Sequence, residues 1–213
     1  MGKENLDEDF DFDDLMAGLP ARSTEELAPR LSTAELKPIM EAQLLALDID
    51  PKGIKLPKLS IIPELHGKQV LLVDDSADVF RKFVPYLVVA TNGEANFIRY
   101  RAGSAGDLAK KILAANPDIA LLDGQLGEKV RGWDVVSLVH KANPRLLCVG
   151  FSAEATFDRA FTAAGAMGFV HKRVDAVEDS MAVLIEQARI LLTLDSLADI
   201  GSDTSLGDSE EDS

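Results

Sequence analysis

The sequence predicts an α/β domain built on a five-stranded parallel sheet, and three observations lead to this fold class. Strand-like apolar runs alternate with helical stretches five times within about 125 residues, starting at Lys68. The runs are continuously apolar, as in strands that are covered by helices on both faces. Polar residues follow several of these runs directly, at their carboxyl ends. Alternation of this kind implies parallel strands joined by helical crossovers.

Each element follows from a local pattern. The expected strands cover 69–73, 97–100, 119–122, 146–150 and 167–170. The expected helices cover 76–89, 104–115, 133–141, 155–164 and about 175–194. Asn92-Gly93 closes the first helix and Asn116-Pro117 breaks the second. The last helix carries one apolar face that includes Met181, Leu184 and Leu191.

The segment before this domain, residues 23–67, is expected to be a partly helical extension and linker. Capping-box spacing occurs from Ser23 to Glu26 and from Ser32 to Glu35, so one or two helices are expected to start there. Pro29 and Pro38 are expected to limit their length. Three further prolines make 51–66 a mostly irregular linker.

The formal charge of −14 is concentrated at the two ends of the chain. Residues 1–30 carry nine acids and three bases, and 195–213 carry seven acids and no base, which leaves −14 + 6 + 7 = −1 for 31–194. The body from 31 to 194 is therefore nearly neutral, and 195–213 is expected to be an acidic, disordered tail. Residues 1–22 fit either a disordered acidic arm or, through apolar residues between Phe10 and Leu19, a short motif that folds on a partner.

Composition also narrows the class of protein. Direct nucleic-acid binding is not expected, because phosphate contacts need clustered Lys and Arg. Cys148 is the single cysteine, so no intrachain disulfide can form and a reducing compartment is indicated. The N-terminus lacks the pattern of a signal peptide, and no apolar stretch approaches the roughly 20 residues of a membrane span. These features predict a cytoplasmic protein with no membrane insertion.

Five polar residues fall at the carboxyl ends of the expected strands: Asp74, Asp75, Asp123, Ser152 and Lys172. Each alone has an ordinary explanation, such as a helix N-cap or a solvated loop residue. Ligands of parallel sheets bind beyond the carboxyl ends of the strands, so the whole set at one edge indicates a site. His66, His140 and His171 are too scattered to be expected as metal ligands.

The chemistry of this set points to a divalent cation and a phosphoryl group. Crowded carboxylates raise one another's pKa, and a hard cation such as Mg²⁺ relieves their repulsion. Asp123 then has the position of a nucleophile that forms an acyl phosphate. Lys172 would supply a cation and Ser152 a hydroxyl donor to the phosphoryl oxygens.

Residues 68–190 resemble the receiver domain of bacterial two-component response regulators. The resemblance rests on four segments: Leu72-Val73-Asp74-Asp75-Ser76, Pro117-Asp118-Ile119-Ala120-Leu121-Leu122-Asp123, Phe151-Ser152-Ala153-Glu154 and Gly168-Phe169-Val170-His171-Lys172. It implies a flavodoxin-like, doubly wound sheet with strand order 2-1-3-4-5. It also implies a phosphorelay protein with Mg²⁺ as cofactor, which accepts a phosphoryl group from a histidine kinase or a histidine phosphotransfer protein.

By this resemblance Asp123 is the phosphoacceptor. Asp75 binds Mg²⁺ directly, Asp74 assists through water, and the carbonyl of Gln125 completes the ligands together with Asp123. Ser152 and Lys172 stabilise the phosphoryl group. Two further roles follow from the resemblance: Ser152 and Phe169 form a switch pair, and Gln125 and Glu154 tune how water reaches the acyl phosphate. Phe169 also fits an ordinary core aromatic.

Three departures from the family pattern flank this site. Arg173 follows Lys172 where the family has a proline after a cis peptide bond, so a trans bond and an altered loop are expected. Leu126-Gly127 replaces the usual Met-Pro, and the stretch from Asp123 to Gly132 is one residue longer than usual. These departures would alter the kinetics of phosphorylation or the choice of partner, but they leave Asp74, Asp75, Asp123 and Lys172 in place.

The leading hypothesis is a receiver protein without a DNA-binding output domain, which signals through contacts with a downstream protein and is not a turnover enzyme. The contact surface is expected on the Phe169 face or on the N-terminal arm, and homodimer formation is left open. The first alternative is a pseudo-receiver scaffold that acts without phosphorylation. A phosphohydrolase is the weaker alternative, because Gln125 stands where such enzymes need a second Asp as general acid.

Overall fold

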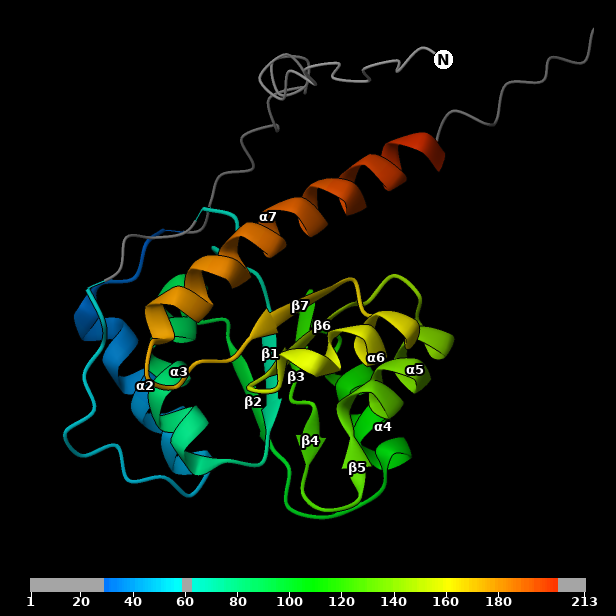
Figure 1. Cartoon of the computed structure of the whole chain (residues 1–213). Helices are drawn as coiled ribbons and strands as arrows, with labels where there is room; N and C mark the ends of the chain where they lie inside the picture. Colours follow the sequence, from blue (N-terminus) through cyan, green and yellow to red (C-terminus); the bar gives the residue numbers. More distant parts are fainter. Residues whose placement is uncertain (1–28, 59–62, 203–213) are drawn as a thin grey trace, which may run out of the picture.

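The structure, a computed structural model, describes residues 29–58 and 63–202 (Figure 1). Its centre is a five-stranded sheet in the order β2-β1-β3-β6-β7, and every neighbouring pair is parallel. The strands are β1 (Val70–Asp74), β2 (Asn96–Arg99), β3 (Ile119–Leu122), β6 (Leu147–Ser152) and β7 (Gly168–His171). Counted along the chain as sheet strands, this is the expected order 2-1-3-4-5, so the predicted fold class is confirmed.

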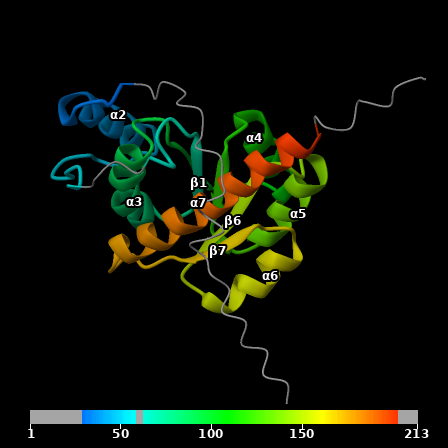
Figure 2. The same cartoon turned by 90° about the horizontal axis from the view of Figure 1, so that it is seen from above.

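Helices cover both faces of the sheet (Figures 1 and 2). They are α3 (Ala77–Ala90), α4 (Ala105–Ala115), α5 (Gly132–Ala142), α6 (Asp158–Ala163) and α7 (Val177–Ser202), with a 3-10 turn η1 (Ala155–Phe157) before α6. Strand residues alternate between two cores. Leu72 packs with residues of α3 and α7, whereas its neighbours Leu71 and Val73 pack with residues of α4 and α5. This alternation explains why the central strands β1 and β3 are apolar on both faces.

An additional helix, α2 (Thr33–Ala46), lies outside α3 and extends the first core (Figure 2). The carboxylate of Glu35 accepts hydrogen bonds from the N–H and hydroxyl of Ser32, as the capping-box spacing predicts. Leu36, Met40 and Leu44 are buried against the domain. The extension is therefore part of the hydrophobic core.

The prediction that Pro38 limits this helix is wrong, because Pro38 lies inside α2. A proline in the second turn removes only one backbone donor, and burial of the apolar face of α2 against α3 outweighs that loss. The helix expected from Ser23 and the apolar motif between Phe10 and Leu19 lie outside the described residues.

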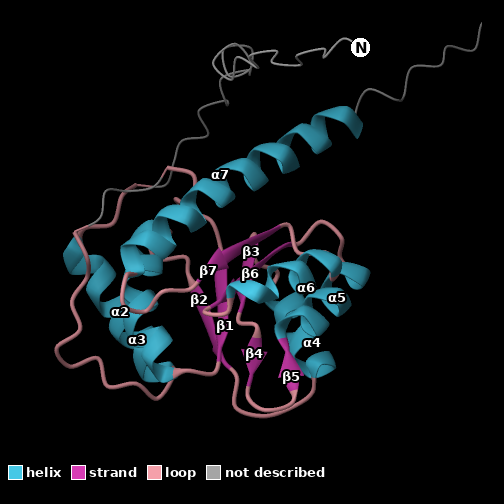
Figure 3. Cartoon of the chain, viewed as in Figure 1, coloured by secondary structure: helices cyan, strands magenta, loops and turns pink. Residues whose placement is uncertain are grey.

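Two more features differ from the expected elements (Figure 3). Helix α7 runs to Ser202, eight residues past the expected end, so 195–202 are helical and not part of a disordered tail. Residues 177–200 contain no glycine or proline to end the helix earlier. A short antiparallel hairpin, β4 (Gln125–Leu126) and β5 (Val130–Arg131), follows β3 and was not expected.

Within the described part of the chain, no helix has the length and apolar character needed to cross a membrane. The described residues also contain no cis peptide bond, so the bond between Lys172 and Arg173 is trans as expected.

Candidate functional site

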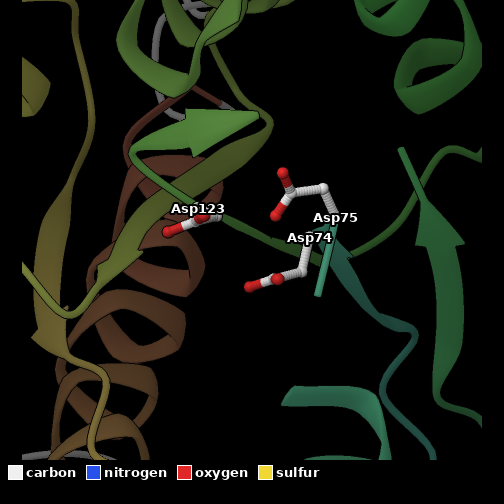
Figure 4. A group of neighbouring side chains, drawn as sticks. All are labelled: Asp74, Asp75 and Asp123. Atoms are coloured by element: carbon white, nitrogen blue, oxygen red, sulfur yellow. The ribbon is translucent and has the colours of Figure 1, made fainter. Parts of the chain in front are cut away.

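The carboxylates of Asp74, Asp75 and Asp123 come together at the carboxyl ends of β1 and β3 (Figure 4). Each residue offers one oxygen, and these oxygens all lie within 4.8 Å of one another. Strands β1 and β3 are direct neighbours in the sheet, with Val73 paired to Leu122, and this register brings the residues that follow them to the same edge. The sheet topology therefore assembles the three acids that the sequence analysis selected.

Lys172 joins two of these acids. Its Nζ atom lies 2.6 Å from Asp74 Oδ2 and 2.9 Å from Asp123 Oδ1. The lysine follows β7 at the end of the sheet, and its side chain is only 7% exposed. Asp74 is fully buried, and Asp123 is buried as well. A lysine held between two buried carboxylates compensates part of their charge, as buried ions require.

Burial and charge set the pKa values in this cluster. Burial raises the pKa of Asp74 from 3.8 to about 6; the carboxylate of Asp123 adds to the rise, and Lys172 opposes it. Burial by itself would lower the pKa of Lys172, but the carboxylates of Asp74 and Asp123 outweigh it and raise that pKa. The ionised form of Asp74 is therefore less stable, relative to its protonated form, than that of a carboxyl group in water.

Backbone N–H groups fix the orientation of each carboxylate. Asp74 Oδ1 accepts from the N–H of Ser76 at 2.8 Å, and Asp123 Oδ1 accepts from the N–H of Gly124 at 2.8 Å. Asp75 Oδ2 accepts from the N–H of Gly127 at 2.8 Å. Asp75 is therefore held by the hairpin β4–β5, which is 52 positions away along the chain.

Three glycines allow this packing, and sequence reasoning did not identify them as part of the site. A Cβ atom on Gly132 would lie 2.0 Å from the backbone oxygen of Asp123. A Cβ atom on Gly124 would lie 2.4 Å from Phe157 Cδ2 and 2.9 Å from Ser152 Oγ. Gly127 has a φ of +64°, which favours glycine. The one available signal was the spacing of three glycines in the loop after the phosphoacceptor candidate.

The other predicted residues occupy different positions relative to the carboxylates. Ser152 ends β6 and is buried, and its Oγ accepts a 3.4 Å hydrogen bond from the N–H of Glu154. Gln125 and Glu154 are exposed to solvent beside the cluster. Phe169 is half-buried in β7, where its ring packs against Phe161 with centroids 5.9 Å apart. Of the described residues, only the three aspartates form a group of possible metal ligands, so none of the histidines joins one.

This donor set fits Mg²⁺. Three carboxylates and one ammonium group carry a formal charge of −3 + 1 = −2 in a mostly buried space. Mg²⁺ is usually held by one or two carboxylates with waters and phosphate oxygens completing its shell. The nearby Lys172 and Ser152 are the kinds of group that stabilise phosphoryl oxygens. The arrangement is chemically able to hold a divalent cation beside a phosphorylated carboxylate.

Sheet order, layers and the position of the acidic cluster define a flavodoxin-like α/β protein with the fold of receiver domains. The chain matches no protein-family model and no curated protein. Receiver domains recur among the solved structures to which it is similar.

Three of the solved structures to which the chain is similar illustrate the likeness. A yeast Spc42 trimeric coiled-coil fusion (amino acids 181–211) is 23% identical with a TM-score of 0.50, over 66% of this chain and 87% of that one. A LuxR-family two-component response regulator from Aurantimonas sp. SI85-9A1 is 24% identical with a TM-score of 0.45, over 57% of this chain and 85% of that one. The response regulator domain of Thermotoga maritima CheB is 18% identical with a TM-score of 0.44, over 59% of this chain and 96% of that one. Likenesses at these identities concern the fold.

Proposed function

We propose that this chain is a response regulator receiver protein that accepts a phosphoryl group on Asp123 with Mg²⁺ as cofactor. One observation carries the proposal: Lys172 bridges Asp74 and Asp123 beside Asp75 at the carboxyl edge of a parallel sheet. A purely structural edge would not need three clustered acids, because their mutual repulsion destabilises the fold. The cluster is explained by a cation and a phosphoryl group that it binds.

The proposed step is an in-line phosphoryl transfer. An oxygen of the Asp123 carboxylate attacks the phosphorus of a phosphohistidine on a histidine kinase or phosphotransfer protein. The new P–O bond forms as the P–N bond breaks, and the imidazole nitrogen takes up the electron pair and then a proton from water. Oδ1 of Asp123 already accepts two interactions, from Lys172 and Gly124, so Oδ2 is the proposed nucleophile.

The residues around Asp123 stabilise the product. Lys172 exchanges its contact with the free carboxylate for one with a phosphoryl oxygen, and the Ser152 hydroxyl donates to another. Asp75, oriented by the N–H of Gly127, and Asp74 would hold the cation, with the Gln125 carbonyl as a further ligand. Bound Mg²⁺ supplies positive charge to the phosphoryl oxygens, as in other phosphoryl-transfer sites.

The remaining predicted residues affect the lifetime of the acyl phosphate and the transmission of the signal to a downstream protein. Gln125 and Glu154 are exposed beside the cluster, where their side chains meet the water that hydrolyses an acyl phosphate. Ser152 and Phe169 are the proposed switch pair, and output runs through contacts with a downstream protein. We place the protein in the cytoplasm, where kinases of this kind supply phosphoryl groups.

Intact-mass measurement after incubation with acetyl phosphate and Mg²⁺ tests the proposal. The wild type is expected to gain one phosphoryl group, and the gain should disappear with EDTA and in Asp123→Asn. The matched control is Asp134→Asn, which removes an exposed acid in the first turn of α5 and should leave the gain intact. Phosphorylation that persists in Asp123→Asn would refute the assignment of the phosphoacceptor. If no variant is phosphorylated and the wild type does not bind fluoroberyllate, the scaffold alternative replaces the proposal.

A further inference from the structure

Four aromatic side chains form a continuous series beside the site. The ring of Trp133 lies 4.9 Å from that of Phe157 and 6.0 Å from that of Phe161, and Phe161 lies 5.9 Å from Phe169. The interplanar angles of 64°, 87° and 48° describe edge-to-face and tilted contacts, which aromatic pairs favour. The series, Phe157–Trp133–Phe161–Phe169, is called the aromatic chain below.

One end of the aromatic chain touches the residue next to the phosphoacceptor. Phe157 packs directly on Gly124, since a Cβ atom there would meet its ring carbons Cδ2 and Cε2 at 2.4 and 3.0 Å. The N–H of Gly124 donates to Asp123 Oδ1, so the ring contacts the backbone that orients this carboxylate. Space at Gly124 is so limited that neither Phe157 nor Ser152 tolerates an added methyl group there.

The other end reaches β7, the edge strand that carries Phe169. Phe161 and Phe169 both pack on Gly150 of β6, where a Cβ atom would meet a Cδ2 carbon of each ring at 2.7 Å. Both rings thus share the space above one glycine, and a displacement of Phe161 must be accommodated by Phe169. The side chain of Gln187 in α7 donates to the backbone oxygen of Phe169 at 2.7 Å, which ties this strand to the last helix.

Ser152 is linked to Phe157 through the short loop between them. The hydroxyl of Ser152 accepts from the N–H of Glu154, and the carbonyl of Glu154 accepts from the N–H of Phe157 at 3.1 Å. A phosphoryl group on Asp123 would attract the hydroxyl of Ser152 as a donor, and movement of the hydroxyl toward that group would lengthen its hydrogen bond from Glu154, which is already 3.4 Å long. The loop that carries Phe157 would then lose a hydrogen bond to Ser152 on the side that faces Asp123.

We propose that Phe157 is a positioning residue that senses the occupancy of Asp123 and transmits it along the aromatic chain to Phe169. The proposal rests on the proposed function, because it assumes a phosphoryl group at Asp123. In the unmodified protein Phe157 rests on Gly124. When the phosphoryl group is present, Phe157 leaves Gly124, Trp133 changes its surroundings, and the Phe161–Phe169 contact adjusts on Gly150.

The fluorescence of Trp133 tests the first half of this chain, because it is the only tryptophan of the protein. Fluoroberyllate with Mg²⁺ serves as the phosphoryl analogue, and its binding is followed separately by calorimetry. In the wild type, binding is expected to shift the tryptophan emission. In Phe157→Leu, binding is expected to persist while the shift is lost, because the ring that touches both Gly124 and Trp133 is absent.

The matched control is Phe97→Leu, a half-buried ring in β2 that packs on Phe80 in the other core. This variant should keep both the binding and the emission shift. Phe157→Met, which retains most of the side-chain volume without the ring, replaces Phe157→Leu if the leucine variant is not fully folded. A fluorine label on the Phe169 ring tests the second half: its resonance should move on binding in the wild type and stay in Phe157→Leu.

The outcomes separate the two proposals. Fluoroberyllate binding with an unchanged emission shift in Phe157→Leu overturns the role of Phe157 and leaves the proposed function in place. Binding without any emission shift in the wild type overturns the aromatic chain in the same way. A wild type that binds no fluoroberyllate and gains no phosphoryl mass overturns the proposed function, and the aromatic chain with it.

Discussion

Replacing Asp74 by Asn should change how the stability of the protein depends on pH. Asp74 is fully buried, and its pKa in the folded protein is about 6, against an ordinary value of 3.8. Asn has nearly the same shape and does not titrate. The substitution therefore removes the strained charge with little change in volume, and Lys172 retains Asp123 as a partner.

The sign and size follow from proton linkage. A carboxyl group with a raised pKa binds its proton more tightly in the folded state, so protonation stabilises the fold. This contribution is fully present below pH 3.8 and is lost as the pH rises through about 6. The difference of about 2 units corresponds to about 3 kcal/mol, of which about 1.4 kcal/mol falls between about pH 5 and pH 8. Asp74→Asn should become more stable relative to wild type by this amount over that interval.

Urea denaturation at several pH values, with EDTA present, measures the effect. The difference between variant and wild type is the relevant quantity, because the other titrating groups largely cancel in it. Asp134→Asn, which replaces an exposed acid in α5 by the same change of side chain, is measured alongside as the control. Mg²⁺ should reverse the order of stability, since a ligand at about 100 times its Kd stabilises the wild type by about 2.7 kcal/mol. A difference for Asp74→Asn that does not change with pH would refute the argument from burial.

Three further substitutions, two of them paired with a control variant, test the core and the site. Met40→Ala should lower the free energy of unfolding by about 2–5 kcal/mol, because Met40 is fully buried. Leu45 is 60% exposed on the same helix, so Leu45→Ala should change that free energy by less than about 0.5 kcal/mol. Equal effects of the two substitutions in urea denaturation would mean that α2 is not part of the core. Gly132→Ala should destabilise the fold, because its Cβ would lie 2.0 Å from the backbone oxygen of Asp123. Gly106→Ala in α4, where the nearest atom would lie at 3.7 Å, should stabilise the fold by up to about 1 kcal/mol. Thermal unfolding of both variants would show any reversal. Lys172→Met should lower the free energy of unfolding in EDTA by about 3–5 kcal/mol, because it leaves two buried carboxylates without their cationic partner. The variant should also no longer be phosphorylated by acetyl phosphate. Unchanged stability would contradict the bridging role of the lysine.

The sheet and the acidic cluster could be predicted because both depend on local patterns. Four of the five sheet strands contain a short apolar run, and chemically distinctive residues come at or just after the carboxyl ends of these strands: Asp74, Asp123, Ser152 and Lys172. Parallel connectivity then places these residues at one edge without knowledge of side-chain contacts. The prediction therefore needed only strand ends and strand direction.

The features that were missed depend on contacts between distant segments. Strands β4 and β5 have two residues each, too few to give a pattern, and the hydrogen bond between Gly127 and Asp75 spans 52 positions. Helix α2 continues through Pro38 because its apolar face is buried against α3, which propensity alone does not show. The aromatic chain likewise combines Trp133 of α5 with rings from η1, α6 and β7.

Chemical trapping of the phosphorylated residue tests the central claim most directly. Acetyl phosphate and Mg²⁺ are added to the wild type, borohydride then reduces any aspartyl phosphate to homoserine, and peptide mass spectrometry locates the altered residue. We predict homoserine at position 123 alone, and none when EDTA replaces Mg²⁺ or when the protein is Asp123→Asn. Homoserine at another aspartate, or an unaltered Asp123 in protein that has gained phosphoryl mass, would contradict the assignment of Asp123 as the phosphoacceptor.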